Sequence, residues 1–390
     1  MNKFLSSIIL FFLAFDPQVP FLPNGVGFSF LIFFILLPVF LLKCFQGRIG
    51  GIVKAASPIL ILFFFIWIYV TLKLIANGGD NVEFLLSLLK AFFIFGAIFL
   101  FFAVFYGERE VGREFVFKLI FVYVLNAIFN FIIGSYPEQF NFLNVFRSQT
   151  ITDSLGGNPY RNSFISGSGY FSIGTAYGLA ALFTSFCIVK YNVRHVLLGA
   201  AVVIVGIAGF VAARTSFFAI LFSSLYVFAK KPLYAFFIAS LAFLLLSLVL
   251  FLPALQPYIE WMKSFFIEFE SSGSANYLLS EMYFWPGADI FFFGSGAVND
   301  GAFVYTDAGY MQDVLFGGVF YLALKLLFVA IYFYAAQKIS FGYAALFCIS
   351  VLLFHIKGLF IFSNAQGMAI FYFSYFYFRL FKDAKFNYSC

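Results

Sequence analysis

The residue with the clearest chemical potential is Arg214, in the stretch FVAARTSFF between Phe210 and Phe218. Apolar runs flank it on both sides, which places this arginine at a membrane face in a tight hairpin. An arginine near the middle of a bilayer costs about 2.5–3.5 kcal/mol unless it meets an anion or a water-filled cavity. The sequence therefore predicts an anion site at Arg214. The alternative is an arginine that snorkels to lipid headgroups.

Three further cations stand in outward-facing positions. Arg161 lies in the stretch NPYRNSFISGSGY, where Gly167 and Gly169 follow it. A guanidinium fork together with exposed backbone N–H groups is a phosphate-binding combination. Lys357 lies in a short turn late in the chain, and Arg147 precedes Arg161 without glycines beside it. We expect Arg161, Arg214 and Lys357, and after them Arg147, to bind a phosphate-bearing substrate.

Two titratable groups are candidates for acid–base chemistry. Asp307 directly precedes a predicted helix, so it is expected either to cap that helix or to act as a base toward a hydroxyl group. His355 lies at the end of a later helix, where it would act as a base near neutral pH or form a structural hydrogen bond. The two histidines fall on opposite faces, and no cysteine pair has zinc spacing, so the sequence predicts neither a metal nor another cofactor.

The composition requires a membrane to hold these residues. The chain is 63% hydrophobic and 10% charged, which is typical of a polytopic membrane protein. A bilayer core of about 30 Å needs about 20 apolar residues per helix. We predict a single all-α domain over residues 1–390 with about twelve crossings: Phe4–Phe15, Val26–Leu42, Pro58–Ala76, Phe84–Tyr106, Phe115–Gly134, Tyr170–Val189, Val196–Ala212, Ser216–Ala229, Leu233–Leu252, Gly309–Ala336, Phe341–Phe354 and Leu359–Phe378.

Basic residues in the short loops predict the orientation. With the N-terminus inside, fifteen of the 23 Lys and Arg residues fall on the cytoplasmic side, as the positive-inside rule requires. Both termini are then cytoplasmic, and two long loops, 135–169 and 253–308, lie outside. The net charge of +6 is a topology signal of this kind and does not indicate a nucleic-acid partner.

Several short motifs together resemble the O-antigen polymerases of the Wzy type. They are Tyr160, Arg161 and Gly167 before the sixth helix, Arg214 with Thr215, the GSG of Gly294–Gly296, the stretch Thr306–Gly318 and a late IKG. The resemblance implies a fold similar to the GT-C glycosyltransferases, in the bacterial inner membrane. It also implies an enzyme that joins undecaprenyl-pyrophosphate-linked oligosaccharide repeat units at the periplasmic face.

In such a reaction, the growing lipid-linked chain is the donor and an incoming unit is the acceptor. Arg161, Arg214, Lys357 and Arg147 would stabilise the pyrophosphate leaving group, and Asp307 or His355 would take the acceptor proton. Tyr160, Gly167, Gly169 and Tyr310 would belong to the substrate-facing segments. The implied partners are the lipid-linked glycans, membrane lipids and a chain-length regulator.

Three other functions remain open from the sequence. An O-antigen ligase is expected to have a functional histidine in the large outer loop, and residues 253–308 contain none. A flippase or other transporter is expected to show internal repeats and charges near the membrane midplane. The cations noted above instead gather at the outer face. A membrane acyltransferase would need a catalytic histidine, for which His355 is the candidate.

Overall fold

The computed structural model describes residues 3–23, 25–47, 49–77, 82–107, 111–147, 161, 164–192, 196–250, 256, 258, 260, 263, 280–296 and 306–381. Within these residues the secondary structure is helical, apart from one isolated antiparallel bridge between Gln18 and Gly27. Tyr160 and most of the two predicted outer loops lie outside the described residues.

Every one of the twelve predicted apolar segments contains a helix. Six of the helices are long and apolar enough to cross a membrane by length and composition, namely α2, α3, α4, α5, α7 and α14. The twelve are α1 (Lys3–Phe15), α2 (Phe28–Phe45), α3 (Gly50–Ala76), α4 (Glu83–Phe105), α5 (Arg113–Ser135), α7 (Tyr170–Lys190), α8 (Val196–Ala212), α9 (Phe217–Lys230), α10 (Pro232–Leu250), α14 (Gly309–Ala336), α15 (Phe341–Lys357) and α16 (Ala365–Leu380).

The outer surface of this bundle is apolar. Large side chains such as Phe34, Phe64 and Phe65 are exposed on α2 and α3. Soluble monomers rarely expose extended apolar surface, whereas lipid tails accommodate it without cost. The architecture is therefore that of a multi-pass membrane protein.

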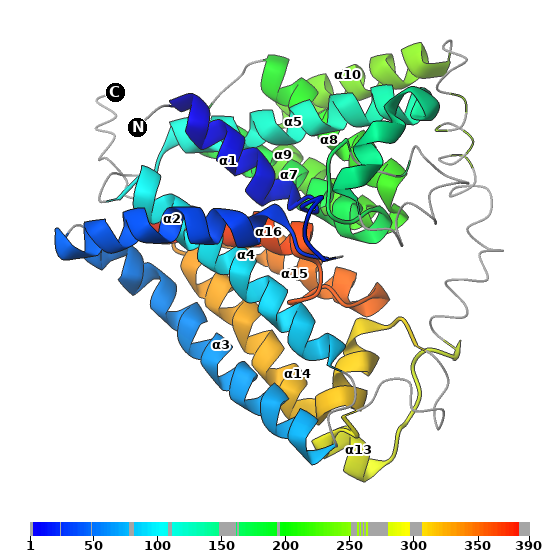
Figure 1. Ribbon diagram of the computed structural model, residues 1–390. Coiled ribbons are helices and arrows are strands. Elements are labelled where there is room, and N and C mark those ends of the chain that lie inside the picture. Colours follow the sequence, from blue (N-terminus) through cyan, green and yellow to red (C-terminus); the bar gives the residue numbers. More distant parts are fainter. Residues whose placement is uncertain are drawn as a thin grey trace.

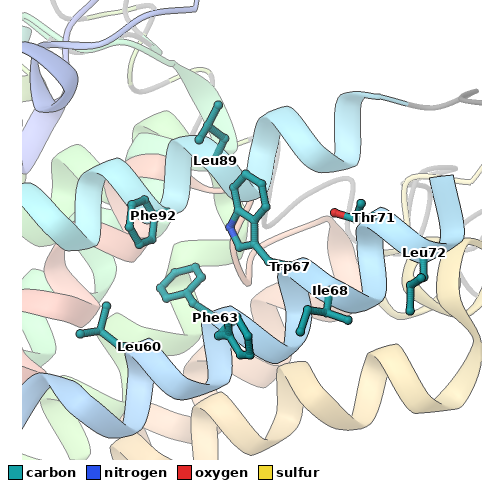
Figure 2. Close-up of a pocket in the computed structure, with 9 residues that line it drawn as sticks. Leu60, Phe63, Trp67, Ile68, Thr71, Leu72, Leu89 and Phe92 are labelled. Carbon is teal, nitrogen blue, oxygen red and sulfur yellow. The ribbon is translucent and has the colours of Figure 1, made fainter. Parts of the chain in front are cut away.

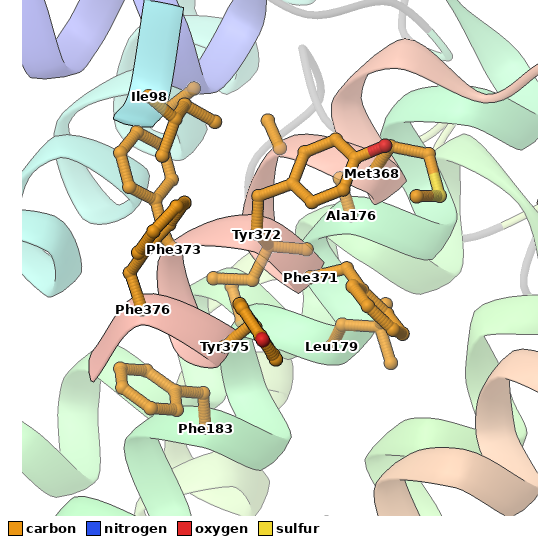
Figure 3. Close-up of a cluster of buried hydrophobic side chains, with 14 of the residues drawn as sticks. Ile98, Ala176, Leu179, Phe183, Met368, Phe371, Tyr372, Phe373, Tyr375 and Phe376 are labelled. Carbon is orange, nitrogen blue, oxygen red and sulfur yellow. The ribbon is translucent and has the colours of Figure 1, made fainter. Parts of the chain in front are cut away.

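Helix α16 lies between two groups of helices (Figure 1). On one side it contacts α3, α4 and α14, and on the other side it contacts α7, which packs against α8 and α9. Residues 365–378 of α16 are all buried. Figure 3 shows Phe371, Tyr372, Phe373 and Phe376 of this helix among side chains of its neighbours. A helix that is apolar on every face is a central one.

The two ends of the bundle are defined by contacts between helix ends. At one end, the Gln366 side chain donates to the Phe15 carbonyl at 2.9 Å, which joins the start of α16 to the end of α1. At the other, Lys118 donates to Ser6 at 3.0 Å and Arg379 to the Lys54 carbonyl at 3.4 Å. The start of α1 and the end of α16 therefore lie at the same end. We call the end of the bundle where α16 begins the arginine end. The opposite end, where α1 begins and α16 ends, is called the terminal end.

One predicted boundary fails near the arginine end, and one helix whose bounds were predicted contains a break that was not. The last helix begins at Ala365, not at Leu359, because the chain reverses after Gly358 and Asn364 caps the new helix with a 2.7 Å bond to the Gly367 amide. The long α14 is interrupted at Gly318, where φ is 68°. Parts of the outer loops are also helical, as the 3-10 segment η1 (Pro137–Phe146) and the short α13 (Ala288–Phe293).

Candidate functional site

Arg161 is held at the end of α8. Its Nε and Nη2 each donate to the Ala212 carbonyl at 3.4 Å, and its guanidinium lies 4.6 Å from the centre of the Tyr170 ring. Ala212 is the last residue of α8, where helical carbonyls lack intrahelical partners and favour a cation. The sequence separation of 51 residues between donor and acceptor shows that this contact joins distant segments.

Arg214 follows two residues after that carbonyl. It begins the single 3-10 turn η4 (Arg214–Ser216), which separates α8 from α9, so the tight hairpin predicted around it is present. Small residues on α7 allow the turn to pack closely: a Cβ on Gly174 would lie 2.5 Å from the Ala213 Cβ. Arg161 and Arg214 are thus brought to one place by α7 and α8.

Two hydroxyl groups lie beside Arg214. Thr215 Oγ1 and Ser216 Oγ are buried and have no hydrogen-bond partner among the described residues. Buried hydroxyls normally find partners, since leaving one unpaired costs about 1–3 kcal/mol. They are therefore donors without an acceptor at this turn in the ranges that the structure describes.

Lys357 and Asp307 meet the same region from another direction. Lys357 ends α15, and its half-buried side chain forms no ion pair or hydrogen bond within the described part of the chain. The next residue, Gly358, is packed so that a Cβ on it would lie 3.4 Å from the Phe171 ring and 3.8 Å from the Asp307 carbonyl. The end of α15 therefore lies close to Asp307 and to Phe171, the residue after Tyr170, whose ring contacts the Arg161 guanidinium.

Asp307 is not the cap of α14. The capping position is Ala308, whose amide donates to Thr306 Oγ1 at 3.1 Å, and no side chain caps the helix. The predicted N-cap is therefore wrong. The chain turns one residue later, because Thr306 also engages the Gln312 side chain through its carbonyl at 2.7 Å.

Arg147 has a local structural task. It donates to Asn144 Oδ1 at 2.8 Å and to the Phe164 carbonyl at 3.4 Å, so it links η1 to the segment before α7. Burial lowers the pKa of the Arg147 guanidinium to about 10, because the charged form is poorly solvated there. The side chain remains charged at neutral pH.

The two glycines after Arg161 serve close packing. The Gly167 amide donates to the Phe15 carbonyl at 3.1 Å, and Gly169 occupies the N-cap position of α7. Around them, polar side chains connect α7 to α16: Ser172 donates to Asn364 Oδ1 at 2.7 Å and to Gln366 Oε1 at 2.6 Å, and Ser168 also bonds to Gln366. This network fixes the start of α7, where Tyr170 supports Arg161.

A buried ion cluster lies inside the bundle. Lys325 Nζ is 2.6 Å from Asp313 Oδ1, and His355 Nε2 is 2.8 Å from Asp313 Oδ2. At most 1% of any of these three side chains is exposed. Neither Asp313 nor Lys325 is among the predicted site residues, although ionisable residues within membrane segments are functional candidates by default. The cations therefore do not all gather at the outer face, since Lys325 is buried within α14.

His355 has both ring nitrogens engaged. Its Nδ1 accepts hydrogen bonds from the Phe360 amide at 3.1 Å and the Ile361 amide at 3.5 Å. The ring proton is therefore on Nε2, which donates it to Asp313. The Tyr310 ring packs edge-on against the histidine at 4.7 Å, and its hydroxyl donates to the Leu352 carbonyl at 3.1 Å. A role as base would require His355 to give up one of these bonds.

The interruption of α14 explains how Asp313 and Lys325 meet, and what the GSG motif does. Carbonyls that the break releases are bonded by other segments: the Ser295 amide donates to Leu315 at 2.7 Å, the Gly296 amide to Phe316 at 2.8 Å and the Tyr69 hydroxyl to Gly317 at 2.5 Å. Gly294 approaches so closely that a Cβ would lie 2.5 Å from the Phe316 carbonyl. The GSG motif therefore supplies amide donors to carbonyls that the break in α14 leaves without helical partners.

An apolar groove lies elsewhere. It has a volume of about 700 Å³ and is formed by α3 and α4 (Figure 2), with this lining: Leu60, Phe63, Phe64, Trp67, Ile68, Thr71, Leu72, Leu89 and Phe92. None of the predicted site residues belongs to it. Since Phe64 and Leu72 are largely exposed, the groove is part of the apolar outer surface that packs against lipid.

Comparison with known proteins leaves the motifs as the only link to a family. No protein-family model, curated protein or solved structure matches the chain. Within the described residues, no three His, Cys, Asp or Glu side chains are grouped to hold a metal ion. The case for a function depends on the geometry at the arginine end.

Proposed function

We propose that this protein polymerises undecaprenyl-pyrophosphate-linked oligosaccharide repeat units at the periplasmic face of the bacterial inner membrane, as a metal-independent glycosyltransferase. One observation carries the proposal: three cations that are far apart in the sequence, Arg161, Arg214 and Lys357, lie on contacting elements at one end of the bundle. In this proposal all twelve helices cross the membrane in a GT-C-like arrangement, with both termini in the cytoplasm.

The proposed site matches the charge of the reaction. A lipid pyrophosphate gains negative charge as the glycosidic bond to it breaks, and cations already in place lower the barrier. Arginine is suited to this role because its planar fork binds two phosphate oxygens at once. The Thr215 and Ser216 hydroxyls would donate further hydrogen bonds to the leaving group.

The acceptor hydroxyl would lose its proton to Asp307 in this scheme. The Asp307 backbone lies next to the end of α15, which brings this residue close to Lys357 in the chain fold. His355 is the second candidate for the base. Its bonds to Asp313 and to the Phe360 amide make it the less accessible of the two.

A deletion strain tests the proposal. Surface glycolipids from it are separated on a gel after complementation with wild type, Arg161→Ala, Arg214→Ala or the control Arg113→Ala, an exposed arginine at the terminal end. We expect the deletion to reduce the ladder to a core with a single repeat, and only wild type and Arg113→Ala to restore it. An unchanged ladder in the deletion strain would rule out a glycan function.

A lipid-linked oligosaccharide flippase is the second candidate, because a buried Lys–Asp pair beside a broken helix also occurs in transporters. Against it, carbonyls released at the break are bonded by Ser295, Gly296 and Tyr69, so they do not face a coupling ion. The same gel separates the functions, because loss of a flippase or a ligase leaves the core with no repeat at all.

A further inference from the structure

The buried cluster of Asp313, Lys325 and His355 holds the last turn of α15, from which Lys357 extends. His355 is two residues before Lys357 in this turn. Asp313 binds the ring from α14, and the amides of Phe360 and Ile361 bind it from the segment after the helix. The imidazole is therefore fixed from both sides of the helix end.

Other contacts restrain the same turn. The Tyr283 hydroxyl donates to the Ile356 carbonyl at 2.9 Å. Gly309 packs so tightly that a Cβ on it would lie 2.5 Å from the carbonyl oxygens of both His355 and Gly358. The start of α14, where Asp307 lies, is therefore joined directly to the end of α15.

We infer that Asp313 is a positioning residue for the pyrophosphate site: through His355 it fixes the end of α15, and thereby places Lys357 beside Asp307. This inference rests on the proposed function. Lys325 compensates the charge of the buried Asp313 carboxylate, with its Nζ 2.6 Å from Asp313 Oδ1. The same ammonium group lies 4.9 Å from the centre of the Tyr321 ring. Without a cation beside it, a carboxylate in this place would be strongly disfavoured.

Two double variants separate the effect of the cluster's charges from the effect of the hydrogen bond between Asp313 and His355. In Asp313→Asn/Lys325→Met both charges are gone, but the Asn oxygen still accepts the proton of His355 Nε2. In Asp313→Leu/Lys325→Met the side chain has a similar shape and accepts nothing. Both pairs avoid an unpaired buried charge, and apolar replacement of a buried ion pair is often neutral for stability.

The experiment measures elongation by purified full-length protein on lipid-linked repeat units extracted from the deletion strain. We expect the Asn/Met pair to retain most of the wild-type kcat and the Leu/Met pair to lose about 10- to 100-fold, because small displacements of a charged group cost that much. KM should change little, since the cation acts mainly on the developing charge. Thermal unfolding of both variants should occur within a few degrees of each other.

A second arm tests the path through Lys357. In a Lys357→Ala background, the Leu/Met and Asn/Met pairs should differ less than twofold, because the group that Asp313 positions is gone. Equal kcat for the two pairs in the wild-type background would overturn the inference. So would an undiminished difference in the Lys357→Ala background. If wild-type protein elongates nothing, the proposed function itself fails and the inference falls with it.

Discussion

The molecule holds its important cations in two contrasting ways. At the arginine end, Arg161 contacts a carbonyl oxygen and an aromatic face, both at helix ends. Inside the bundle, Lys325 contacts a carboxylate at 2.6 Å and is 1% exposed. The contacts at Arg161 orient its guanidinium at a helix end, whereas the Asp313 carboxylate compensates the charge of Lys325.

This difference distinguishes cations that are suited to binding a substrate from a cation that supports the fold. A positive charge that is oriented at the membrane edge can still attract an anionic substrate. A charge compensated inside the membrane has little effect beyond its immediate contacts, so its value lies in the geometry it imposes. In the proposed function Arg161 and Arg214 act on the substrate and Lys325 supports the fold, so variants of each should fail differently.

The largest effect is expected from removing half of the buried pair. Asp313→Ala leaves Lys325 as an uncompensated charge and should lower the free energy of unfolding by about 3–5 kcal/mol. The measurement is thermal or denaturant unfolding of the purified protein in detergent. Asp313→Asn/Lys325→Met is the matched control and should unfold close to wild type, because it removes both charges and keeps an acceptor for His355 Nε2. If the single and double variants were equally stable, the pair would not be compensating a charge.

At the arginine end, replacing Arg214 should lower the rate of catalysis and leave the stability of the fold near that of wild type. Arg214→Ala should lower kcat for chain elongation by about 10²–10³-fold, the usual cost of removing one donor from a developing negative charge. Arg214→Lys should recover part of this, since it restores the charge but not the fork. Unfolding temperatures should stay near wild type for both. A large fall in stability with unchanged kcat would place Arg214 in the same class as Lys325.

The sequence predicted the first region far better than the second. Arg214 and Lys357 are visible because each interrupts an apolar run, and the structure places Arg214 in the turn η4 and Lys357 at the last residue of α15, not in the turn predicted for it. The twelve helical segments follow from the same apolar runs. Composition is sufficient for these features because each is local.

The buried cluster depends on a break that composition does not reveal. Asp313 and Lys325 are 12 residues apart, which corresponds to about 18 Å along an uninterrupted helix, too far for an ion pair. They meet because Gly318 adopts φ 68° and the segment after α13 bonds the released carbonyls. Two signals were available: the pair Gly317–Gly318, and a 28-residue run that, at about 42 Å, exceeds a bilayer core.

The contact between the start of α14 and the end of α15 can be strained by a substitution that changes no charged residue. Gly309→Ala would place a Cβ 2.5 Å from two carbonyl oxygens at the end of α15 and force them apart. We expect a cost of about 1–3 kcal/mol in stability, as for other overpacked sites, together with reduced elongation. Gly342→Ala is the control, because on that glycine the nearest atom lies 3.9 Å away. Unfolding and elongation assays on the same samples would show whether strain at the junction reaches the site.

The smallest effect tests whether orientation alone matters at the arginine end. Tyr170→Leu removes the ring 4.6 Å from the Arg161 guanidinium, and a cation–π contact near a surface contributes about 0.5–1 kcal/mol. Elongation should therefore slow by about two- to fivefold, while Tyr170→Phe, which keeps the ring, should match wild type. The measured quantity is kcat/KM for the lipid-linked donor. If Tyr170→Phe were as slow as Tyr170→Leu, the hydroxyl of Tyr170 and not its ring would account for the effect on elongation.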